Sequence, residues 1–424
     1  MGKKVRQVPA VPDALPAVGA PALAQEVAFP VAVSENGRYF VDGNGTPVFW
    51  IGTTQWQLFR EYTPEEARTI LERTAAHGFR FVQVMLLGVG DGTQPNVSGQ
   101  KPWLNDDPLT PNEEYFRDVD TVVRMAGECN LAISMTIYHQ RYRERLTPEN
   151  ARAWAHRLAT RYRDVPQIVW SMTPRAEDEY IPVLRELAVG LHEGDGGNHL
   201  ITFKPDPSPY SSSFIHDEDW LDFNSMQTWA DVQLICPMVT HDYNLRPVKP
   251  VLMAEGAYEA GSEYGFEVSP LWVRRQAYYS YLAGAHHTYG HNDSWRVLPT
   301  WREALDAPGA VQMGILKRFF MARPEWWLMV PDQSILASGG RTDGRLLHLA
   351  ARHRDGRWAV VYLSEPTSFS VNLDRLAGSA VSAVWVNPET GDASPAGSLR
   401  ASGTQPFSSP DHWADALLVL DGEA

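Results

Sequence analysis

Cysteine is scarce in this chain of 424 residues, which contains only Cys129 and Cys236. Two cysteines are too few for a disulfide framework or for a thiolate zinc site. Long apolar runs are also missing, and none approaches the ~20 residues that a membrane-spanning helix needs. The sequence therefore predicts no disulfide scaffold, no cysteine-bound metal and no membrane span.

Basic residues are also few in comparison with acidic ones. The chain has 37 Lys and Arg residues and 51 Asp and Glu residues, which gives a net charge of −14. Such an acidic surface repels phosphate backbones and anionic lipids, so neither nucleic acid nor a membrane surface is expected as a partner. Hydrophobic residues make up 44% and charged residues 21%, which is close to the average for globular proteins and allows a sizeable core. Nothing in the sequence indicates an oligomeric state.

Aromatic residues are plentiful at 11%, with 15 Trp among them. Part of this aromatic content belongs in any large core, because these side chains bury much area. An excess of Trp also suits pockets that stack against the flat faces of sugar rings. Composition alone leaves both interpretations open.

Residues 1–30 are predicted to form a flexible tail, since they contain five prolines and no periodic apolar pattern. Ala22-Leu23-Ala24 resembles a small-residue cleavage site, but no apolar run of seven or more residues precedes it. We therefore predict a cytoplasmic protein rather than a secreted one.

Residues 31–330 begin with a predicted β-meander over 31–52 and continue with strand-like runs that alternate with amphipathic segments. Eight such alternations over about 280 residues are typical of a (β/α)8 TIM barrel. A doubly wound open sheet is the alternative, but no Gly-rich phosphate-binding turn follows the first strand. Strands are predicted at 47–54, 79–87, 131–138, 167–172, 199–204, 222–229, 250–258 and 284–290, and helices at 63–78, 112–130, 147–164, 177–196 and 269–284.

Residues 331–424 change to an apolar period of two, with turn residues between short runs. This pattern predicts a small all-β sandwich after the barrel. Its strands are expected at 345–353, 357–364, 368–373, 380–387, 392–397 and 413–420.

A TIM barrel carries out its chemistry at the C-terminal ends of its strands, so the polar residues there are the candidate site. Amides, Trp rings and a few carboxylates follow these strands, and hydrolysis at an acetal carbon needs two carboxyl groups. The candidate substrate-binding residues are Thr53, Trp56, His139, Arg175, Lys204, Gln227, Trp229, Tyr289, His291, Asp293 and Trp295.

Glu255 is the strongest catalytic candidate, because it ends the buried run 251–254. An ionisable group in that place is costly unless it is hydrogen-bonded or functional, and a purely structural carboxylate is the alternative. Glu177 and Asp178 follow the fourth strand and are the candidate acids, although both also suit the first turn of a helix. Arg175 cannot act as a general acid, but it could bind a substrate carboxylate.

A metal site would have to use His286, His287 and His291 with Asp293. The HExxH spacing is absent, and adjacent histidines on a strand point to opposite faces. The sequence therefore predicts no metal and no cofactor. The absence of a GxSxG motif also argues against an esterase.

Several segments resemble the apiosidase-like glycoside hydrolases, glycoside hydrolase family 140. They include ENGRYFVDGNGTPVFWIGTTQWQLF, KPVLMAEGAYE and HHTYGHNDSW, while WVNPETGD resembles the family's collagen-binding-like C-terminal sandwich. The resemblance runs from residue 34 to the end. It implies a retaining exo-glycosidase with a glutamate nucleophile on the seventh strand and an aspartate acid/base after the fourth. The family's motif Asp-Gly-Glu-Pro-x-Tyr-Glu is similar to residues 254–259, which assigns the nucleophile to Glu255.

The chain departs from the family pattern at two positions. The fourth strand of the family ends Trp-x-x-Gly-Gly-Asp, and here Arg175 stands at the place of the aspartate. The first strand of the family reads Gly-Asp-Thr-x-Trp, and here Thr53 replaces the aspartate. Either Glu177 or Asp178 has taken over as the acid, or the mechanism differs, or activity is lost.

These observations predict an exo-acting, retaining glycoside hydrolase with a carbohydrate substrate. The expected glycone is a small or branched sugar of plant or microbial origin, with furanosides among the candidates. One alternative is a carbohydrate-binding barrel that has lost hydrolysis. Another is an acidic-sugar lyase or isomerase that clamps a carboxylate with Arg175 and Lys204.

Overall fold

The computed structural model describes residues 29–207 and 214–423. The predicted tail, apart from its last two residues, lies outside the described residues. The same is true of the segment Ala22-Leu23-Ala24, on which the predicted location depends.

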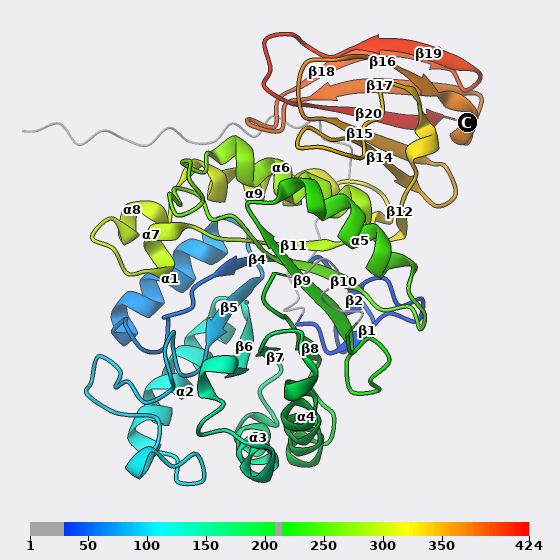
Figure 1. Cartoon of the computed structure of the whole chain (residues 1–424). Helices are drawn as coiled ribbons and strands as arrows, with labels where there is room; N and C mark the ends of the chain where they lie inside the picture. Colours follow the sequence, from blue (N-terminus) through cyan, green and yellow to red (C-terminus); the bar gives the residue numbers. More distant parts are fainter. Residues whose placement is uncertain (1–28, 208–213, 424) are drawn as a thin grey trace, which may run out of the picture.

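Eight parallel strands close into a barrel in the order β10-β11-β4-β5-β6-β7-β8-β9 (Figure 1). Each strand falls within or overlaps one of the eight predicted runs, so the TIM barrel is confirmed and the open-sheet alternative is wrong. The strands are β4 (Ile51–Thr54), β5 (Phe81–Met85), β6 (Ala132–His139), β7 (Ile168–Thr173), β8 (Ile201–Phe203), β9 (Phe223–Trp229), β10 (Val251–Gly256) and β11 (His286–Tyr289).

Helices surround the barrel, and the sequence predicted those with an apolar stripe and a clear start. Thr63 caps the first of them and forms a capping box with Glu66. The sequence did not predict α5, α7, α8 or α9, and α7 and α8 span only four residues each, which is too short for a periodic signal. The helices are α1 (Pro64–Ala76), α2 (Glu113–Glu128), α3 (Pro148–Tyr162), α4 (Ile181–Asp195), α5 (Ile235–Asn244), α6 (Pro270–Ala283), α7 (Asn292–Trp295), α8 (Trp301–Ala304) and α9 (Pro308–Met321).

The predicted meander forms a three-stranded sheet of β1 (Ala32–Val33), β2 (Phe40–Val41) and β3 (Pro47–Val48). Phe40 from this sheet packs against Trp50, Phe223 and His286, with ring centroids 5.0–5.1 Å apart. These rings belong to a buried cluster inside the barrel near the start of its strands. The N-terminal end of the barrel is therefore filled by side chains of the described residues.

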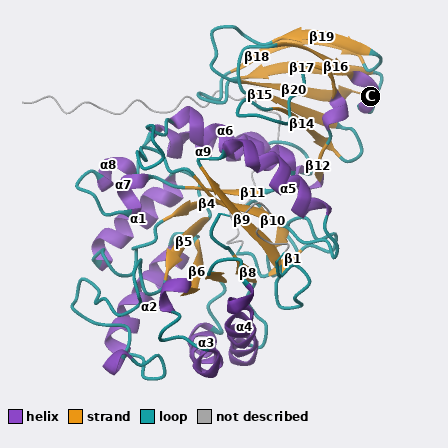
Figure 2. Ribbon diagram, viewed as in Figure 1, coloured by secondary structure: helices purple, strands orange, loops and turns teal. Residues whose placement is uncertain are grey.

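The chain after the barrel forms the predicted sandwich, which Figure 2 shows as strands stacked beside the helical shell. One sheet has the order β12-β14-β15-β20-β17-β18 and the other the order β13-β16-β19. The sequence missed β12, β13 and β19, which are short or interrupted by proline. The strands are β12 (Met329–Pro331), β13 (Leu336–Ser338), β14 (His348–His353), β15 (Trp358–Leu363), β16 (Ser368–Asn372), β17 (Ala380–Val386), β18 (Ala393–Arg400), β19 (Thr404–Ser408) and β20 (Ala416–Glu423).

The sandwich rests on helices of the barrel, above α5 and α6 in Figure 1. One buried apolar cluster runs without a break from Tyr278 of α6 and Phe320 of α9 to Tyr362 of β15 and Leu417 of β20. The rings of Tyr278 and Tyr362 stack at 4.7 Å. The two domains therefore share a core and are not joined by a linker alone.

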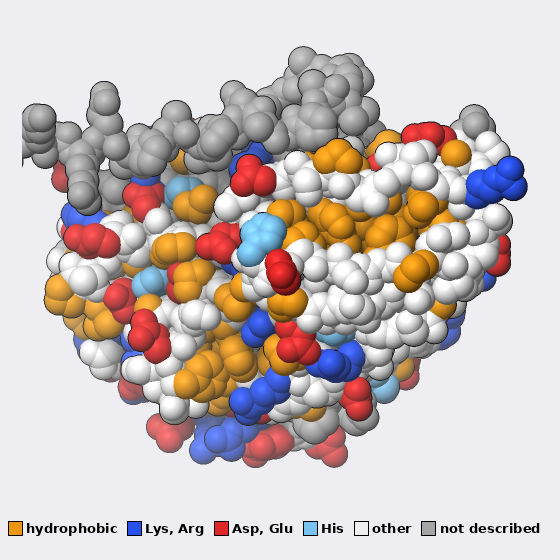
Figure 3. Space-filling model, turned by 90° about the horizontal axis from the view of Figure 1, so that it is seen from above, with side chains coloured by type: hydrophobic (Ala, Val, Ile, Leu, Met, Phe, Trp, Pro, Cys, Tyr) orange, Lys and Arg blue, Asp and Glu red, His pale blue; other side chains and the backbone are white. Residues whose placement is uncertain are grey.

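The outer surface of the sandwich is poor in charge. In Figure 3, which looks down on this side of the molecule, hydrophobic side chains gather over the sandwich among uncharged residues.

Within the described part of the chain, no helix is both long enough and apolar enough to cross a bilayer.

Candidate active site

A cavity of about 500 Å³ opens at the C-terminal ends of the barrel strands. Its volume lies within the usual range of small-molecule sites. It brings together many of the residues that the sequence singled out at separate strand ends. Those lining it are Trp56, His139, Arg175, Lys204, Gln227, Trp229, Glu255 and Trp295.

Glu255 lies near the end of β10, where its backbone is opposite Gln227 of β9 and the strand pairing is irregular. Its carboxylate Oε2 is 2.5 Å from the Nζ of Lys204, which follows β8. Only 11% of the Glu255 side chain and 6% of the Lys204 side chain are exposed. The predicted nucleophile is therefore held in a nearly buried ion pair.

Two aromatic residues complete the surroundings of this ion pair. The Nζ of Lys204 lies 4.7 Å from the centroid of the Trp56 ring, close enough for a cation–π contact. The Trp56 indole donates a hydrogen bond of 2.9 Å to the hydroxyl of Tyr258. Burial raises the pKa of Tyr258 well above its usual value, and the charge of Glu255 raises it further. Tyr258 therefore remains protonated beside the carboxylate.

Trp229 stands at the mouth of the cavity with 45% of its surface exposed. Its backbone has φ of +47°, an uncommon conformation for a residue other than glycine. Its indole donates to Oε1 of Gln227 at 2.9 Å, and the Gln227 amide in turn donates to the carbonyl of Pro205. This chain of contacts fixes an aromatic face where a sugar ring could stack.

Asp206 is a second carboxylate of the cavity, two residues after Lys204. It accepts a hydrogen bond of 2.8 Å from Nε2 of Gln140, and its Oδ2 is 3.7 Å from Nε of Arg175. These donors follow β6 and β7, so the Asp206 side chain reaches toward the end of the fourth barrel strand. Asp206 is not among the residues predicted from the sequence. Its place two residues after Lys204, just beyond the fifth strand, is the signal that could have identified it.

Glu177 and Asp178 do not line this cavity. Glu177 precedes the 3-10 helix η3 (Asp178–Tyr180), and its Oε1 lies 3.8 Å from the Arg175 guanidinium. About half of its side chain is exposed. Glu177 and Asp178 therefore lie at the start of a helical segment, as the alternative interpretation expected. Their catalytic role stays a prediction.

The cavity contains a third carboxylate, Glu263, which the sequence did not single out. Glu263 is paired with Arg296 at 3.3 Å, and the Arg296 guanidinium lies 4.7 Å from the Trp295 ring centroid. Tyr264 also lines the cavity. Glu263 and Tyr264 lie in the loop between β10 and α6, where no periodic pattern marks them.

Four predicted substrate-binding residues are not among those lining the cavity. Tyr289 donates to Glu259 at 2.5 Å within the apolar layer behind the barrel. His291 caps α7 by accepting from the backbone of Asp293, whose carboxylate accepts from Thr300. Thr53 is buried within β4. Tyr289, His291 and Asp293 therefore contact local groups, and the role of these four residues in substrate binding stays a prediction.

The histidines of β11 point to opposite sides of the strand, as expected. His286 packs against Phe40 inside the barrel, whereas Nδ1 of His287 lies 3.1 Å from the hydroxyl of Ser280 on α6. Burial lowers the pKa of His286 to about 4 and that of His287 to about 3. His139 in the cavity is also neutral, because burial lowers its pKa to about 3. No group of three or more metal-ligand side chains occurs within the residues the structure describes.

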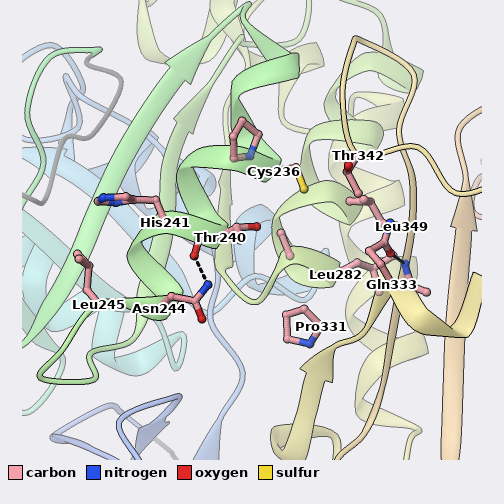
Figure 4. A pocket seen from close by; sticks show the side chains of 13 residues that line it. Cys236, Thr240, His241, Asn244, Leu245, Leu282, Pro331, Gln333, Thr342 and Leu349 are labelled. Atoms are coloured by element: carbon pink, nitrogen blue, oxygen red, sulfur yellow. Dashed lines mark hydrogen bonds between the residues drawn. The ribbon is translucent and has the colours of Figure 1, made fainter. Parts of the chain in front are cut away.

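A second cavity of about 710 Å³ lies where the barrel meets the sandwich. Figure 4 shows side chains from α5 (Cys236, Thr240), the end of α6 (Leu282) and the sandwich (Pro331, Leu349) around it. Among the described residues no carboxylate lines this cavity, so they do not supply here the two carboxyl groups that glycoside hydrolysis requires.

Two solved structures that match most of this chain are described as glycoside hydrolases. One described as a glycoside hydrolase has a TM-score of 0.84 and 28% identity, and the match covers 93% of this chain and 97% of that one. A glycoside hydrolase family 5 structure from Bacteroides vulgatus ATCC 8482 also has a TM-score of 0.84, with 26% identity and coverage of 93% and 94%. Together with the carboxylates in the barrel cavity, these matches define the protein as a glycoside hydrolase.

The chain belongs to the apiosidase-like family, because the family model "Apiosidase-like, catalytic domain" matches residues 34–327. A second model, "Putative collagen-binding domain of a collagenase", matches residues 330–421. No curated protein matches the chain. A family 27 β-L-arabinopyranosidase from Geobacillus stearothermophilus shares the fold, with a TM-score of 0.55, 11% identity and coverage of 89% and 97%.

Proposed function

We propose that this glycoside hydrolase is an exo-acting, retaining enzyme that removes one small or branched terminal sugar, with furanosides among its substrates. The observation that carries the proposal is the nearly buried carboxylate of Glu255 in a cavity of about 500 Å³ at the C-terminal ends of the barrel strands. A cavity of this volume suits one small terminal sugar better than the middle of a polysaccharide. Trp229 and Trp295 offer aromatic faces for the sugar ring.

In the proposed mechanism, Glu255 attacks the anomeric carbon and the bond to the leaving oxygen breaks. A carboxyl group protonates that oxygen. Water then attacks the same carbon, and the glycosyl–Glu255 ester bond breaks to release the sugar with retained configuration. The second carboxyl group takes the proton from this water and returns to its starting state.

We assign the second carboxyl group to Asp206. Its contacts with Gln140 and Arg175 bring it toward the end of β7, where the resemblance implies an aspartate. Arg175 lies beside this carboxylate with more than half of its side chain exposed, so an incoming substrate can displace it. Glu177 and Asp178 remain the alternatives from the sequence.

Loss of hydrolysis is the competing proposal. It is favoured by Arg175 in place of the expected acid and by the close pairing of Glu255 with Lys204. The acidic-sugar lyase or isomerase has less support, because Lys204 contacts Glu255 and Arg175 lies between Asp206 and Glu177.

The test is the release of reducing sugar from a panel of aryl furanosides and pyranosides, with NMR observation of the anomer formed first. We expect turnover with retention and its loss in Glu255→Gln. Glu267→Gln, an exposed carboxylate of the same loop, is the matched control. Binding without turnover across the panel supports the binding-protein alternative, and an inverted first product contradicts the retaining mechanism.

A further inference from the structure

Lys204 is the only cation of the described chain found in contact with the Glu255 carboxylate. Its ammonium group is held by Oε2 of Glu255 on one side and by the face of Trp56 on the other. With 6% of the Lys204 side chain exposed, bulk water contributes little to the solvation of this charge. The charge of Glu255 is therefore its main compensation.

We infer that Lys204 is a positioning residue that favours the second half of the reaction over the first. It holds Oε2 and so leaves Oε1 to act as the attacking atom. It also stabilises Glu255 as a leaving group when the glycosyl ester is hydrolysed. This inference rests on the retaining mechanism proposed above.

The charge balance of the two steps gives the reason. In the first step Oε1 of Glu255 forms a bond to the anomeric carbon, and the bond to the leaving oxygen breaks with protonation by Asp206. Glu255 becomes a neutral ester, and Lys204 is left as a buried cation without its partner, which is costly. In the second step water attacks the carbon and Asp206 takes the proton. Glu255 departs with the bonding electron pair, and the ion pair forms again.

Lys204 thus raises the barrier to forming the ester and lowers the barrier to hydrolysing it. In the wild-type enzyme the first step should limit turnover, and the ester should not accumulate. Removal of the Lys204 charge should reverse this order. A lysine that served the fold alone would lower stability or overall activity without changing which step is limiting.

The experiment uses the full chain and its Lys204→Met and Lys204→Gln variants with a panel of 2,4-dinitrophenyl furanosides and pyranosides. Stopped-flow absorbance measures the phenolate burst, and intact-protein mass spectrometry measures the glycosyl adduct. Lys317→Met is the matched control, because Lys317 is a half-buried lysine of α9 that contacts the carbonyl of Gly78 and not the cavity.

We expect no burst in the wild type or in Lys317→Met. In Lys204→Met we expect a burst of about one equivalent, a glycosyl adduct, and steady turnover that is about 10- to 100-fold slower, which is the worth of one charge-assisted hydrogen bond. Lys204→Gln retains a neutral donor and should lie between the two. If Lys204→Met does not fold, as judged by circular dichroism, the Gln variant decides.

The inference is overturned if both Lys204 variants show the same burst amplitude and the same amount of adduct as the wild type while the wild type forms a retained product. That result leaves the retaining mechanism intact. A wild type that gives inverted product contradicts the proposed function itself. So does a wild type that turns over no glycoside of the panel. In either case the inference about Lys204 is contradicted together with the proposed function.

Discussion

Arg274 of helix α6 and Asp415 of the sandwich form a two-pronged ion pair, with Nε–Oδ2 and Nη2–Oδ1 distances of 2.9 and 2.6 Å. Both side chains are buried, and Tyr362 donates a third hydrogen bond of 2.6 Å to the same carboxylate. The contact joins two residues that are 141 positions apart and that belong to different domains. It makes the sandwich a fixed part of the enzyme.

Breaking this pair should destabilise both domains together. We expect Arg274→Met or Asp415→Asn to lower the free energy of unfolding by about 3–5 kcal/mol, because each leaves a buried charge without its partner. Urea unfolding followed by fluorescence and circular dichroism should still give one transition. Arg302→Met, which removes an exposed pair with Glu66, should cost no more than about 1 kcal/mol. A separate sandwich transition would contradict the shared core.

The buried histidines of β11 predict how stability changes with pH. Burial lowers the pKa of His286 to about 4 and that of His287 to about 3, whereas both titrate near 6.5 in the unfolded chain. Between these values the unfolded state binds more protons, so stability falls as the pH decreases below about 6.5. Each histidine contributes a slope of about 1.4 kcal/mol per pH unit.

His287→Gln should reduce this slope, as measured by urea unfolding at several pH values from 4.5 to 7.5. The comparison concerns the slope and not the absolute stability, which the substitution also changes. An exposed histidine such as His412 gives the matched control, since His412→Gln should leave the slope unchanged. Equal slopes in the wild type and in His287→Gln would show that His287 does not cause the pH dependence of stability.

The assignment of the proton donor can be tested through leaving groups. Asp206→Asn should slow glycosides with poor leaving groups by about 10²–10⁴-fold, the usual worth of general acid catalysis. Dinitrophenyl glycosides need little protonation and should lose much less in the first step. Glu177→Gln, the alternative from the sequence, is measured in the same assay. A selective loss in Glu177→Gln and not in Asp206→Asn would transfer the role to Glu177.

Trp229 is expected to bind sugar through its exposed ring. Trp229→Ala should raise KM by about 3- to 10-fold with a smaller effect on kcat, because aromatic contacts of this kind are worth about 0.5–1.5 kcal/mol. Trp229→Phe retains a ring and should recover part of the affinity. A change in kcat alone would mean that the residue acts through Gln227, to which its indole donates, and not through the substrate.

Much of the fold could be predicted because it depends on local patterns. The alternation of strand-like and amphipathic runs predicts the barrel, and the change to a period of two predicts the sandwich. Helices α7 and α8 could not be found in this way. Each spans only four residues, about one turn, which is too short to show a period of 3.6.

The sequence by itself determined the eight strands, their order along the chain and the place of Glu255 at the end of an apolar run. Only the tertiary structure decided which strand ends share the cavity and which side chains face it. Lys204 contacts Glu255 across 51 residues of sequence, and Asp206 reaches Gln140 across 66. Tyr289, His291 and Asp293 satisfy local groups instead. The physical reason is that periodicity records whether a residue is buried, whereas its partner depends on how the barrel closes.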